Sequence, residues 1–379
     1  MTQHAPADAD RLLTHVADTL GHPVPAEWEQ AMRAVPRHAF LPERLWLRDG
    51  AGGYEPCDRG TDPAGWWAAA YSDAPLVTQL HVDGDGFQEP TSSASAPGTV
   101  VRMLEYADLR DGHHVLEIGT GTGYHAGLLS HRLGEEQVTS IEVDPVLAEQ
   151  ARANLKTAGY TPTVITGDGA AGHIDTAPYD RIICTCSVRA VPTAWLAQAR
   201  PGARIVTPWS TSWITYGTVT LTATEDGTAT GQFAPWGAYM VMRGQRATAD
   251  LDDIHRPEHR YEQTSTELSP WDVAGADYDT QLAIGLRAPD VWHSWDAQPD
   301  VDGAQVRLWL ADDAASSWAA VDYDGQQAGT FRVRQHGPRH LWNEIAAAHQ
   351  DWDAAGRPTV EQHRLHISAD GTVTLHAEA

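Results

Sequence analysis

The chain has 379 residues, enough for two domains, and its 51 acidic against 26 basic side chains give a formal net charge of −25. Such an acidic surface repels nucleic-acid phosphates and anionic membranes, which argues against RNA, DNA or a membrane as partner. No apolar run reaches the ~20 residues that a membrane-spanning helix needs. Residues 1–10 are polar and lack the apolar core of a secretory signal, so we expect a cytoplasmic location.

The cysteines and histidines do not predict a metal site. Cys57, Cys184 and Cys186 are few and odd in number, and we expect the last two to serve in packing, with redox or metal roles as alternatives. The 19 histidines are scattered, and none stands with a cysteine at zinc-binding spacing. We therefore expect the histidines to have surface or structural roles.

Residues 46–70 contain several glycines, which are Gly50, Gly52, Gly53 and Gly60. Glycine gives the backbone freedom without adding a side chain to pack. The segment is predicted to form either a flexible lid or a surface loop.

Residues 115–123 read Val-Leu-Glu-Ile-Gly-Thr-Gly-Thr-Gly, an apolar strand that runs directly into a glycine loop. Because Gly119, Gly121 and Gly123 have no Cβ, the turn can be tight and its amide groups stay accessible to a small ligand. The motif alone is weak evidence, since glycine loops also bind dinucleotides and phosphates.

Strands and helices alternate from this loop onward. Strands are predicted at 114–118, 138–143, 164–166, 179–186 and 204–207, and helices at 123–133, 146–156 and 194–200. This alternation predicts right-handed crossovers and an α/β fold with a parallel, doubly wound sheet. Ligands bind such sheets beyond the carboxyl ends of the strands. The glycine loop, Glu142, Asp168 and Thr185 all fall at strand ends, so they are predicted to converge on one crevice.

The acidic residues near the loop help to choose the ligand. Glu142 follows the loop by about 20 residues, where an acid can bind two ribose hydroxyls. An acid at that position argues against a ligand with a 2′-phosphate. It does not distinguish NAD from S-adenosylmethionine. The alternating glycines differ from the dinucleotide pattern G-x-G-x-x-G, and Glu117 suits a cationic amino-acid ligand better than a phosphate. The pattern therefore favours S-adenosylmethionine, which has a sulfonium and no pyrophosphate.

The remainder of the chain predicts a second domain. Strands near 213–223 and 232–242 complete a first domain of residues 1–243, and the polar stretch that follows is assigned as a linker, residues 244–278. Residues 279–379 are predicted to form a small α+β domain. Its strands are expected at 282–286, 306–310, 318–321, 330–333, 364–367 and 373–376, with a hairpin turn at 369–372 and a helix between Gly337 and Gly356.

Tryptophan is concentrated in this second domain, at Trp292, Trp295, Trp309, Trp318, Trp342 and Trp352. We expect most of these side chains to form its core, and some of them to form a floor that binds a peptide. A structural appendage or a dimer contact is the alternative role for the domain.

Several blocks in chain order carry a family resemblance. They are 34–42 (Ala-Val-Pro-Arg-His-Ala-Phe-Leu-Pro), 71–76 (Tyr-Ser-Asp-Ala-Pro-Leu), 93–97 (Ser-Ala-Ser-Ala-Pro), 115–123, 141–142, 167–169 and 177–180. Together they resemble the protein-L-isoaspartate (D-aspartate) O-methyltransferase family. The resemblance implies a Rossmann-like core, S-adenosylmethionine as cofactor with S-adenosylhomocysteine as product, and methyl transfer to a carboxylate.

The resemblance also implies roles for single residues. Ser95 matches the serine associated with the reacting carboxylate, although a loop serine bonded to its own backbone is the alternative. The implied cofactor-binding residues are Glu117, Gly119, Thr120, Gly121, Gly123, Glu142, Asp168, Gly169 and Thr185. The implied substrate-binding residues are Ser93, Pro97 and Gly98.

Two departures from the family bear on the acceptor. Gly98 stands where the family usually carries an aromatic residue or histidine, at a position expected to shape the acceptor pocket. The chain is also longer, and this extended form resembles methyltransferases encoded with lanthipeptides, lasso peptides and ATP-grasp-crosslinked peptides (graspetides). That resemblance implies a modified precursor peptide as partner, with an aspartate converted to aspartimide and then, in some cases, to isoaspartate.

Three functional hypotheses follow. The first is an enzyme that methylates one aspartate of a cyclised precursor peptide. The second is a repair enzyme that acts on isoaspartyl proteins. The third is a protein that binds the cofactor and uses its second domain for docking without turnover. The oligomeric state is left open.

Overall fold

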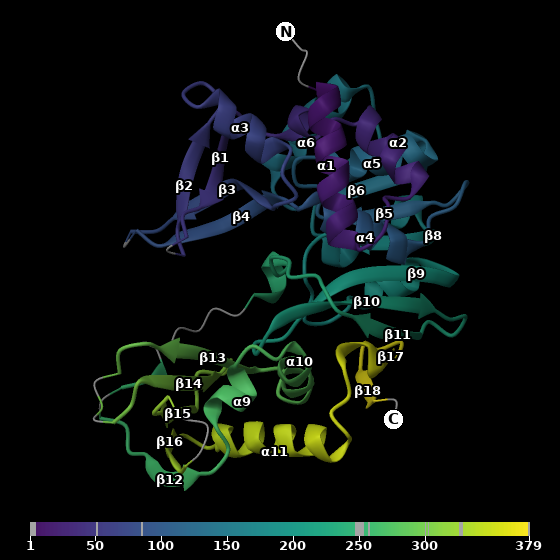
Figure 1. The fold of residues 1–379 in the computed structure, drawn as a ribbon. Coiled ribbons are helices and arrows are strands. Elements are labelled where there is room, and N and C mark those ends of the chain that lie inside the picture. Colours follow the sequence, from purple (N-terminus) through teal and green to yellow (C-terminus); the bar gives the residue numbers. More distant parts are fainter. Residues whose placement is uncertain are drawn as a thin grey trace. The chain divides into compact units, whose positions relative to one another are not determined.

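The computed structural model describes residues 5–50, 52–84, 86–246, 254–256, 258–299, 301, 303–325 and 329–377 (Figure 1). Contacts divide the chain into two compact units. Unit 1 comprises Met1–Thr185, Pro192–Val206 and Thr220–Ala229. Unit 2 comprises Cys186–Val191, Thr207–Val219 and Thr230–Ala379. Among the described residues, no helix combines the length and apolar character needed to cross a membrane.

The central element of unit 1 is a parallel sheet, as the alternating pattern predicted. Its strands are β5 (Val115–Ile118), β6 (Val138–Glu142), β7 (Thr163–Thr166), β8 (Tyr179–Cys184) and β9 (Ala199–Ser210). They lie in the order β9-β8-β5-β6-β7 and pair in parallel. The order reverses between β5 and β8, and the edge beyond the carboxyl ends of these two strands is where open α/β sheets bind ligands.

Helices and short turns connect the strands of unit 1. The helices are α1 (Ala5–Leu20), α2 (Ala26–Ala34), α4 (Pro97–Ala107), α5 (Tyr124–Leu133), α6 (Pro145–Ala158) and α7 (Thr193–Gln198). The 3₁₀ turns are η1 (Arg37–Phe40), η2 (Glu135–Gln137), η3 (Gly169–Ala171) and η4 (Ile174–Thr176). Helix α6 shows its start signals clearly, because Asp144 accepts hydrogen bonds from the first backbone N–H groups and Pro145 follows it.

A second sheet of unit 1 is antiparallel. It contains β1 (Arg44–Arg48), β2 (Tyr54–Asp58), β3 (Leu76–Val82) and β4 (Gln88–Ala94), in the order β2-β1-β3-β4 (Figure 1). Helix α3 (Pro63–Ala70) follows β2. The prediction of a lid or surface loop at 46–70 was therefore wrong. Cys57 and Trp66 are buried, so this segment packs as regular structure.

The parallel strands belong to a nine-stranded sheet. Strands β10 (Thr215–Ala223), β11 (Ala229–Ala234), β17 (His363–Ile367) and β18 (Val373–Ala377) complete the order β18-β17-β11-β10-β9-β8-β5-β6-β7. The predicted hairpin at 369–372 is confirmed as the β17–β18 turn. Residues 235–242 were predicted as strand, but β11 ends at Ala234. The 3₁₀ turns η5 (Arg243–Gln245) and η6 (Val360–Gln362) also lie in unit 2.

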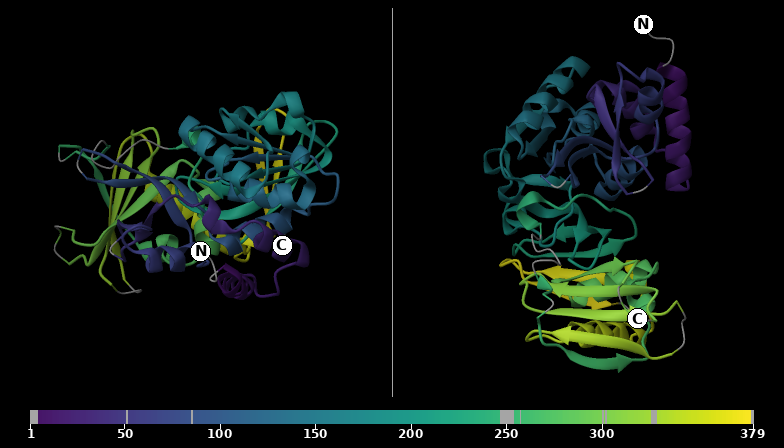
Figure 2. Two further views of the ribbon diagram at one scale, coloured as in Figure 1. Left: turned by 90° about the horizontal axis from the view of Figure 1, so that it is seen from above. Right: turned by 90° about the vertical axis from the view of Figure 1, so that its left-hand side faces the viewer.

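Unit 2 also contains a five-stranded antiparallel sheet. It comprises β12 (Glu262–Thr266), β13 (Val291–Asp296), β14 (Val306–Asp312), β15 (Trp318–Tyr323) and β16 (Phe331–His336), in the order β12-β16-β15-β14-β13. The described part of this unit includes the helices α9 (Pro270–Ala274), α10 (Tyr278–Arg287) and α11 (Leu341–Ala354). Figure 2 shows α11 lying along one face of the sheet.

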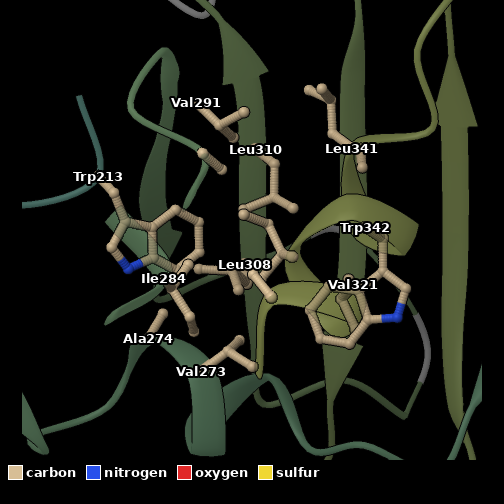
Figure 3. Close-up of a cluster of buried hydrophobic side chains, with 14 of the residues drawn as sticks. Trp213, Val273, Ala274, Ile284, Val291, Leu308, Leu310, Val321, Leu341 and Trp342 are labelled. Atoms are coloured by element: carbon tan, nitrogen blue, oxygen red, sulfur yellow. The ribbon is translucent and has the colours of Figure 1, made fainter. Parts of the chain in front are cut away.

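The core of unit 2 lies between this sheet and its helices. Leu308 and Leu310 of β14 pack with Ile284 of α10 and Trp342 of α11 (Figure 3). Trp213 belongs to the same cluster. The expectation that tryptophans of the second domain form its core is confirmed at Trp342, which is 3% exposed.

Two predictions for the second domain were wrong. Residues 282–286 were predicted as strand but form the buried part of α10, because a short apolar run does not distinguish a strand from a buried helix. The predicted linker 244–278 contains β12 and α9, so much of it is regular structure. Its residues 247–253 and 257 lie outside the described residues.

Candidate active site

The glycine loop has the backbone that its sequence predicted. Gly119, Gly121 and Gly123 have φ angles of +93°, +54° and +92°, which a side chain would strain. The backbone N–H of Gly119 donates to the carbonyl of Ile141 over 2.9 Å, which ties the loop to the end of β6. A Cβ at Gly123 would stand 3.2 Å from Leu155 Cγ on α6. The loop therefore needs glycine for both conformation and packing.

Thr185 follows β8 and holds the loop from the other side. Its Oγ1 donates to the carbonyl of Gly119 over 2.6 Å, and its backbone N–H donates to the carbonyl of Ile118 over 2.8 Å. A Cβ added to Gly119 would lie 2.6 Å from the same Oγ1. The structure thus brings Thr185 to the loop as predicted, and its hydroxyl contacts the protein backbone there.

Glu142 links the ends of three strands. Its Oε2 accepts a hydrogen bond from the backbone N–H of Gly121 over 2.8 Å, and its Oε1 accepts from that of Asp144 over 3.1 Å. Its backbone carbonyl accepts from the N–H of Gly167 over 2.9 Å. The side chain is 6% exposed. Glu142 therefore lies directly against the loop at the edge where the sequence placed it.

Asp168 and Gly169 follow β7 at the same edge. Asp168 is exposed, and its Oδ1 accepts from the N–H of Ala170 over 2.9 Å, which caps η3. Gly169 is buried against Ile118, where a Cβ would overlap the isoleucine side chain. Its carbonyl accepts a hydrogen bond from the indole N–H of Trp195 over 2.8 Å. Asp168 is thus presented to solvent by a turn that Gly169 anchors.

Glu117 lies beneath the loop rather than facing a ligand. It is 0% exposed, its Oε1 is 2.6 Å from His125 Nδ1, and its Oε2 accepts a hydrogen bond from Ser140 Oγ. Ser140 Oγ also bonds Thr120 Oγ1 over 2.6 Å. Both carboxylate oxygens therefore have partners inside the protein. The geometry does not support the predicted contact of Glu117 with a cationic ligand, and it gives Thr120 a supporting place as well.

The segment that joins β4 to α4 lies beside the loop. Ser92 Oγ and the carbonyl of Ser93 are each 3.9 Å from the position of a Cβ on Gly121. Ser95 is half-buried, and its hydroxyl makes no hydrogen bond to any described residue. Pro97 is buried at the first turn of α4. The structure therefore brings the predicted acceptor segment to the glycine loop, and the Ser95 hydroxyl is free to bond a ligand.

Gly98 lies against Asp73 and Thr19. Its N–H donates to Asp73 Oδ1 over 2.6 Å, and an added Cβ would stand 2.6 Å from Asp73 Oδ2 and 2.9 Å from Thr19 Cγ2. Thr19 Oγ1 in turn donates to Asp73 Oδ2 over 2.5 Å. Helix α1 and Asp73 therefore fill the space that a larger residue at position 98 would take, and the role of Gly98 in binding the acceptor stays a prediction.

Arg37 is the residue of this region that the sequence prediction missed. Its guanidinium is buried, at 1% exposure, and burial lowers its pKa to about 10. Its donors contact the carbonyls of Ala70, Ser72, Ala74, Ala94 and Ser95 at 2.8–3.4 Å. The one sequence signal for a role of Arg37 was its place in the block 34–42. The sequence of that block does not indicate that its charged side chain is buried.

His38 and Tyr71 form a pair of ring side chains. His38 belongs to the sequence block 34–42, which also contains Arg37, and Tyr71 belongs to the block 71–76. His38 Nδ1 and the hydroxyl of Tyr71 share a hydrogen bond of 2.6 Å. Burial lowers the pKa of His38 and raises the pKa of Tyr71 to about 12. Both side chains are therefore neutral at pH 7 and add no charge to this region.

No group of three or more His, Cys, Asp or Glu side chains within the described part of the chain has the geometry to hold a metal ion. Cys57 and Cys184 are buried and Cys186 is half-buried, all as free thiols.

Comparison with known proteins decides the family. A family model described as Protein-L-isoaspartate(D-aspartate) O-methyltransferase (PCMT) matches residues 58–226. A protein-L-isoaspartate O-methyltransferase of Ignicoccus hospitalis is 40% identical over 184 residues, which cover 48% of this chain and 72% of that protein. The chain belongs to the protein-L-isoaspartate O-methyltransferase family. A second relative, protein-L-isoaspartate O-methyltransferase 2 of Archaeoglobus fulgidus, is 34% identical over 57% of this chain and 84% of that protein.

Membership of the isoaspartate methyltransferase family confirms the α/β fold class and S-adenosylmethionine as the cofactor. The matched segment includes the glycine loop, Glu142, Asp168, Thr185 and the Ser93–Gly98 segment. These residues lie together at the carboxyl edge of the parallel sheet. Residues that follow position 226 fall outside the family model.

A solved structure extends the likeness to the rest of the fold. A protein-L-isoaspartate O-methyltransferase structure matches with a TM-score of 0.55 and 21% sequence identity, over 98% of this chain and all of that chain. At this identity the likeness concerns the fold alone. A C-terminal extension of this kind therefore occurs in a protein of that name, and it does not by itself indicate the maturation of a peptide natural product.

Proposed function

We propose that this protein is a carboxyl O-methyltransferase that transfers the methyl group of S-adenosylmethionine to an isoaspartyl side chain. The observation that carries the proposal is the approach of two segments. The carbonyl of Ser93 lies 3.9 Å from the Cβ position of Gly121, so the acceptor segment and the glycine loop share one edge of the sheet. The relatives of Ignicoccus hospitalis and Archaeoglobus fulgidus both carry the name protein-L-isoaspartate O-methyltransferase.

The residues at this edge fit the cofactor. The backbone around Gly119, Gly121 and Gly123 would hold its methionine part, because an added Cβ at Gly121 meets no atom closer than 3.9 Å, so the backbone there leaves room for a close approach. Glu142 would accept hydrogen bonds from the ribose hydroxyls. Asp168, with the turn at Gly169, would contact the adenine. The cofactor supplies an electrophilic methyl group with a neutral thioether as leaving group.

The acceptor needs little help from the protein. An aspartyl or isoaspartyl carboxylate is ionised at neutral pH and is itself the nucleophile. The oxygen–carbon bond forms as the carbon–sulfur bond breaks, so no proton has to move. Ser95 would donate its hydroxyl to one carboxylate oxygen, which orients the nucleophile and leaves its charge in place. Because the acceptor is already an anion, the reaction needs no general base.

A second candidate keeps the same chemistry but changes the acceptor. The chain carries glycine at position 98, where the family resemblance implies a larger residue, and its residues after position 226 lie outside the family model. We infer that an altered acceptor segment would suit an aspartate in a cyclised, ribosomally made precursor peptide. The ester would then lose methanol when the next backbone amide attacks, which gives an aspartimide. The C-terminal domain, residues 279–379, would bind the peptide.

Mass spectrometry of the products separates the hypotheses. The protein would be incubated with S-adenosylmethionine and an isoaspartyl hexapeptide, its aspartyl counterpart, or a cyclised precursor. Methyl ester on the isoaspartyl peptide alone supports the main proposal. Loss of one water from the precursor, with no change in the isoaspartyl peptide, supports the second candidate and overturns the first. Tight cofactor binding with no product from any acceptor would favour a docking protein and contradict both.

A further inference from the structure

Arg37 is an unusual residue to bury. Among the described residues, all of its hydrogen-bond partners are backbone carbonyls, at 2.8–3.4 Å. Its Nε is buried without a hydrogen-bond partner. Removing a charged group from water costs several kcal/mol even after relaxation, so such a residue is costly for stability alone.

The five carbonyls come from two segments that meet at the acceptor side. Ala70 ends α3 and Ser72 and Ala74 lie between α3 and β3, whereas Ala94 and Ser95 lie where β4 ends before α4. The planar guanidinium can bond several acceptors at once in a fixed geometry, which lysine cannot reproduce. Arg37 therefore fixes the backbone of Ser95 relative to the 70–74 segment.

Within the described part of the chain, the guanidinium of Arg37 is hydrogen-bonded to backbone carbonyls alone. Among the described residues, no carboxylate lies within 4.0 Å of its guanidinium nitrogens. Burial lowers the pKa of Arg37, whereas the negative charge of Asp73 stabilises its protonated form and so raises that pKa. The two oxygens of Asp73 accept hydrogen bonds from the N–H of Gly98 and the hydroxyl of Thr19. Hydrogen bonds from neutral donors leave the negative charge of Asp73 in place, so Asp73 offsets part of the Arg37 charge that lies behind the Ser95 carbonyl. An anionic group that binds at the Ser95 hydroxyl is attracted by that charge.

We propose that Arg37 is a positioning residue for the acceptor carboxylate. It holds the Ser95 backbone in place, and its buried charge favours an ionised acceptor at the Ser95 hydroxyl. This inference rests on the proposed carboxyl methyl transfer. It predicts an effect on the binding of the acceptor and none on the binding of the cofactor.

The chain offers a matched control in Arg181. That residue is also buried, at 7% exposure, and donates to the carbonyls of Ala107, Asp108 and Asp180. Two of these partners, Ala107 and Asp108, lie at the C-terminal end of α4, the end opposite to Ser95, and Asp180 lies in β8. Replacing Arg181 removes a comparable set of buried hydrogen bonds at a distance from the acceptor segment.

The test compares Arg37→Gln, Arg37→Lys and Arg181→Gln at a temperature where all three are folded. For each variant the binding of S-adenosylhomocysteine, the binding of an isoaspartyl hexapeptide to the S-adenosylhomocysteine complex, and the KM and kcat for that peptide are measured. We expect Arg37→Gln to raise the peptide Kd and KM at least tenfold, with the S-adenosylhomocysteine Kd within twofold of wild type. The peptide Kd and KM of Arg37→Lys should lie between those of the wild type and those of Arg37→Gln, because lysine keeps the charge and loses the planar geometry.

Arg181→Gln should leave the peptide Kd and KM within twofold of wild type, although it lowers thermal stability. Equal shifts in the Arg37→Gln and Arg181→Gln variants would overturn the inference, as would an unchanged peptide Kd in Arg37→Gln. If Arg37→Gln does not fold, Arg37→Lys decides on the same readouts. Wild-type protein that binds the peptide without methylating it would contradict the proposed function alone, since the binding comparison still tests Arg37.

Discussion

At the scale of single residues, the site separates into groups that face the shared edge and groups that support them. Ser95 and Asp168 present side chains there, whereas Glu117 and Thr185 are engaged with the protein. Sequence spacing predicted the residues at strand ends, because parallel strands bring their carboxyl ends together. It did not predict the burial of Glu117, since an acid beside a glycine loop looks the same whether it points outward or inward.

Ser95→Ala tests the residue closest to the proposed chemistry. The loss of one oriented hydrogen bond to a charged group is worth about 1.5–3 kcal/mol, so kcat/KM for the isoaspartyl peptide should fall by roughly ten- to a hundredfold. Cofactor binding should be unchanged, because Ser95 lies on the acceptor segment. Calorimetric titration with S-adenosylhomocysteine and initial rates check both points, and full activity in the variant would remove Ser95 from the site.

Glu142 and Glu117 make a contrasting pair. Glu142→Gln keeps the shape of the side chain but removes its charge and one acceptor, so the Kd for S-adenosylhomocysteine should rise about tenfold or more, by the ~1.5 kcal/mol of a hydrogen bond to a charged group. Glu117→Gln disturbs a buried network with His125 and Ser140. It should lower the melting temperature more than it changes the cofactor Kd. The reverse ranking in titration and thermal unfolding would show that Glu117, not Glu142, contacts the cofactor.

At the scale of elements, periodic patterns predicted the parallel core and failed where apolar runs were short. Helix α10 was mistaken for a strand because its buried residues, from Thr280 to Leu286, are contiguous and cover all sides of the helix. The β1–β2 hairpin was not predicted because the glycines of its turn indicated a loop, although the strands on both sides of that turn carry buried side chains. Arg37 could not be assigned because its five partners lie far from it in the sequence.

Helix α11 provides a test of the unit 2 core. Ile345 is fully buried in the cluster shown in Figure 3, and Ile345→Ala should lower the free energy of unfolding by about 2–5 kcal/mol through lost burial and a cavity. Gln350 is exposed on the same helix, so Gln350→Ala should stay within about 0.5 kcal/mol. Urea titration measures both. A loss for Ile345→Ala no larger than that of Gln350→Ala would argue against this packing.

At the scale of the whole molecule, stability should depend on pH through His293. Burial lowers the pKa of this imidazole from 6.5 to about 4, and its ring centroid lies 4.5 Å from that of Trp213. Below the unfolded pKa of about 6.5 the unfolded chain binds a proton that the folded chain does not, so stability falls as pH falls toward 4.

The expected slope is up to about 1.4 kcal/mol per pH unit for this one group. Urea unfolding at several pH values between 7.5 and 4 measures this slope. The slope should appear between roughly pH 6.5, the pKa of His293 in the unfolded chain, and about pH 4, its pKa in the folded protein. A His293→Gln variant should lose that part of the dependence. An identical pH profile in the variant and in the wild type would show that His293 is not the group responsible.

The most direct test of the central claim is the rate of methyl transfer from labelled S-adenosylmethionine to a matched pair of hexapeptides, one isoaspartyl and one aspartyl. The proposed function predicts that the purified protein incorporates methyl groups into the isoaspartyl peptide with a kcat/KM at least tenfold above that for its aspartyl counterpart, and that Ser95→Ala reduces this rate. Incorporation into neither peptide, with S-adenosylhomocysteine binding intact, would contradict it.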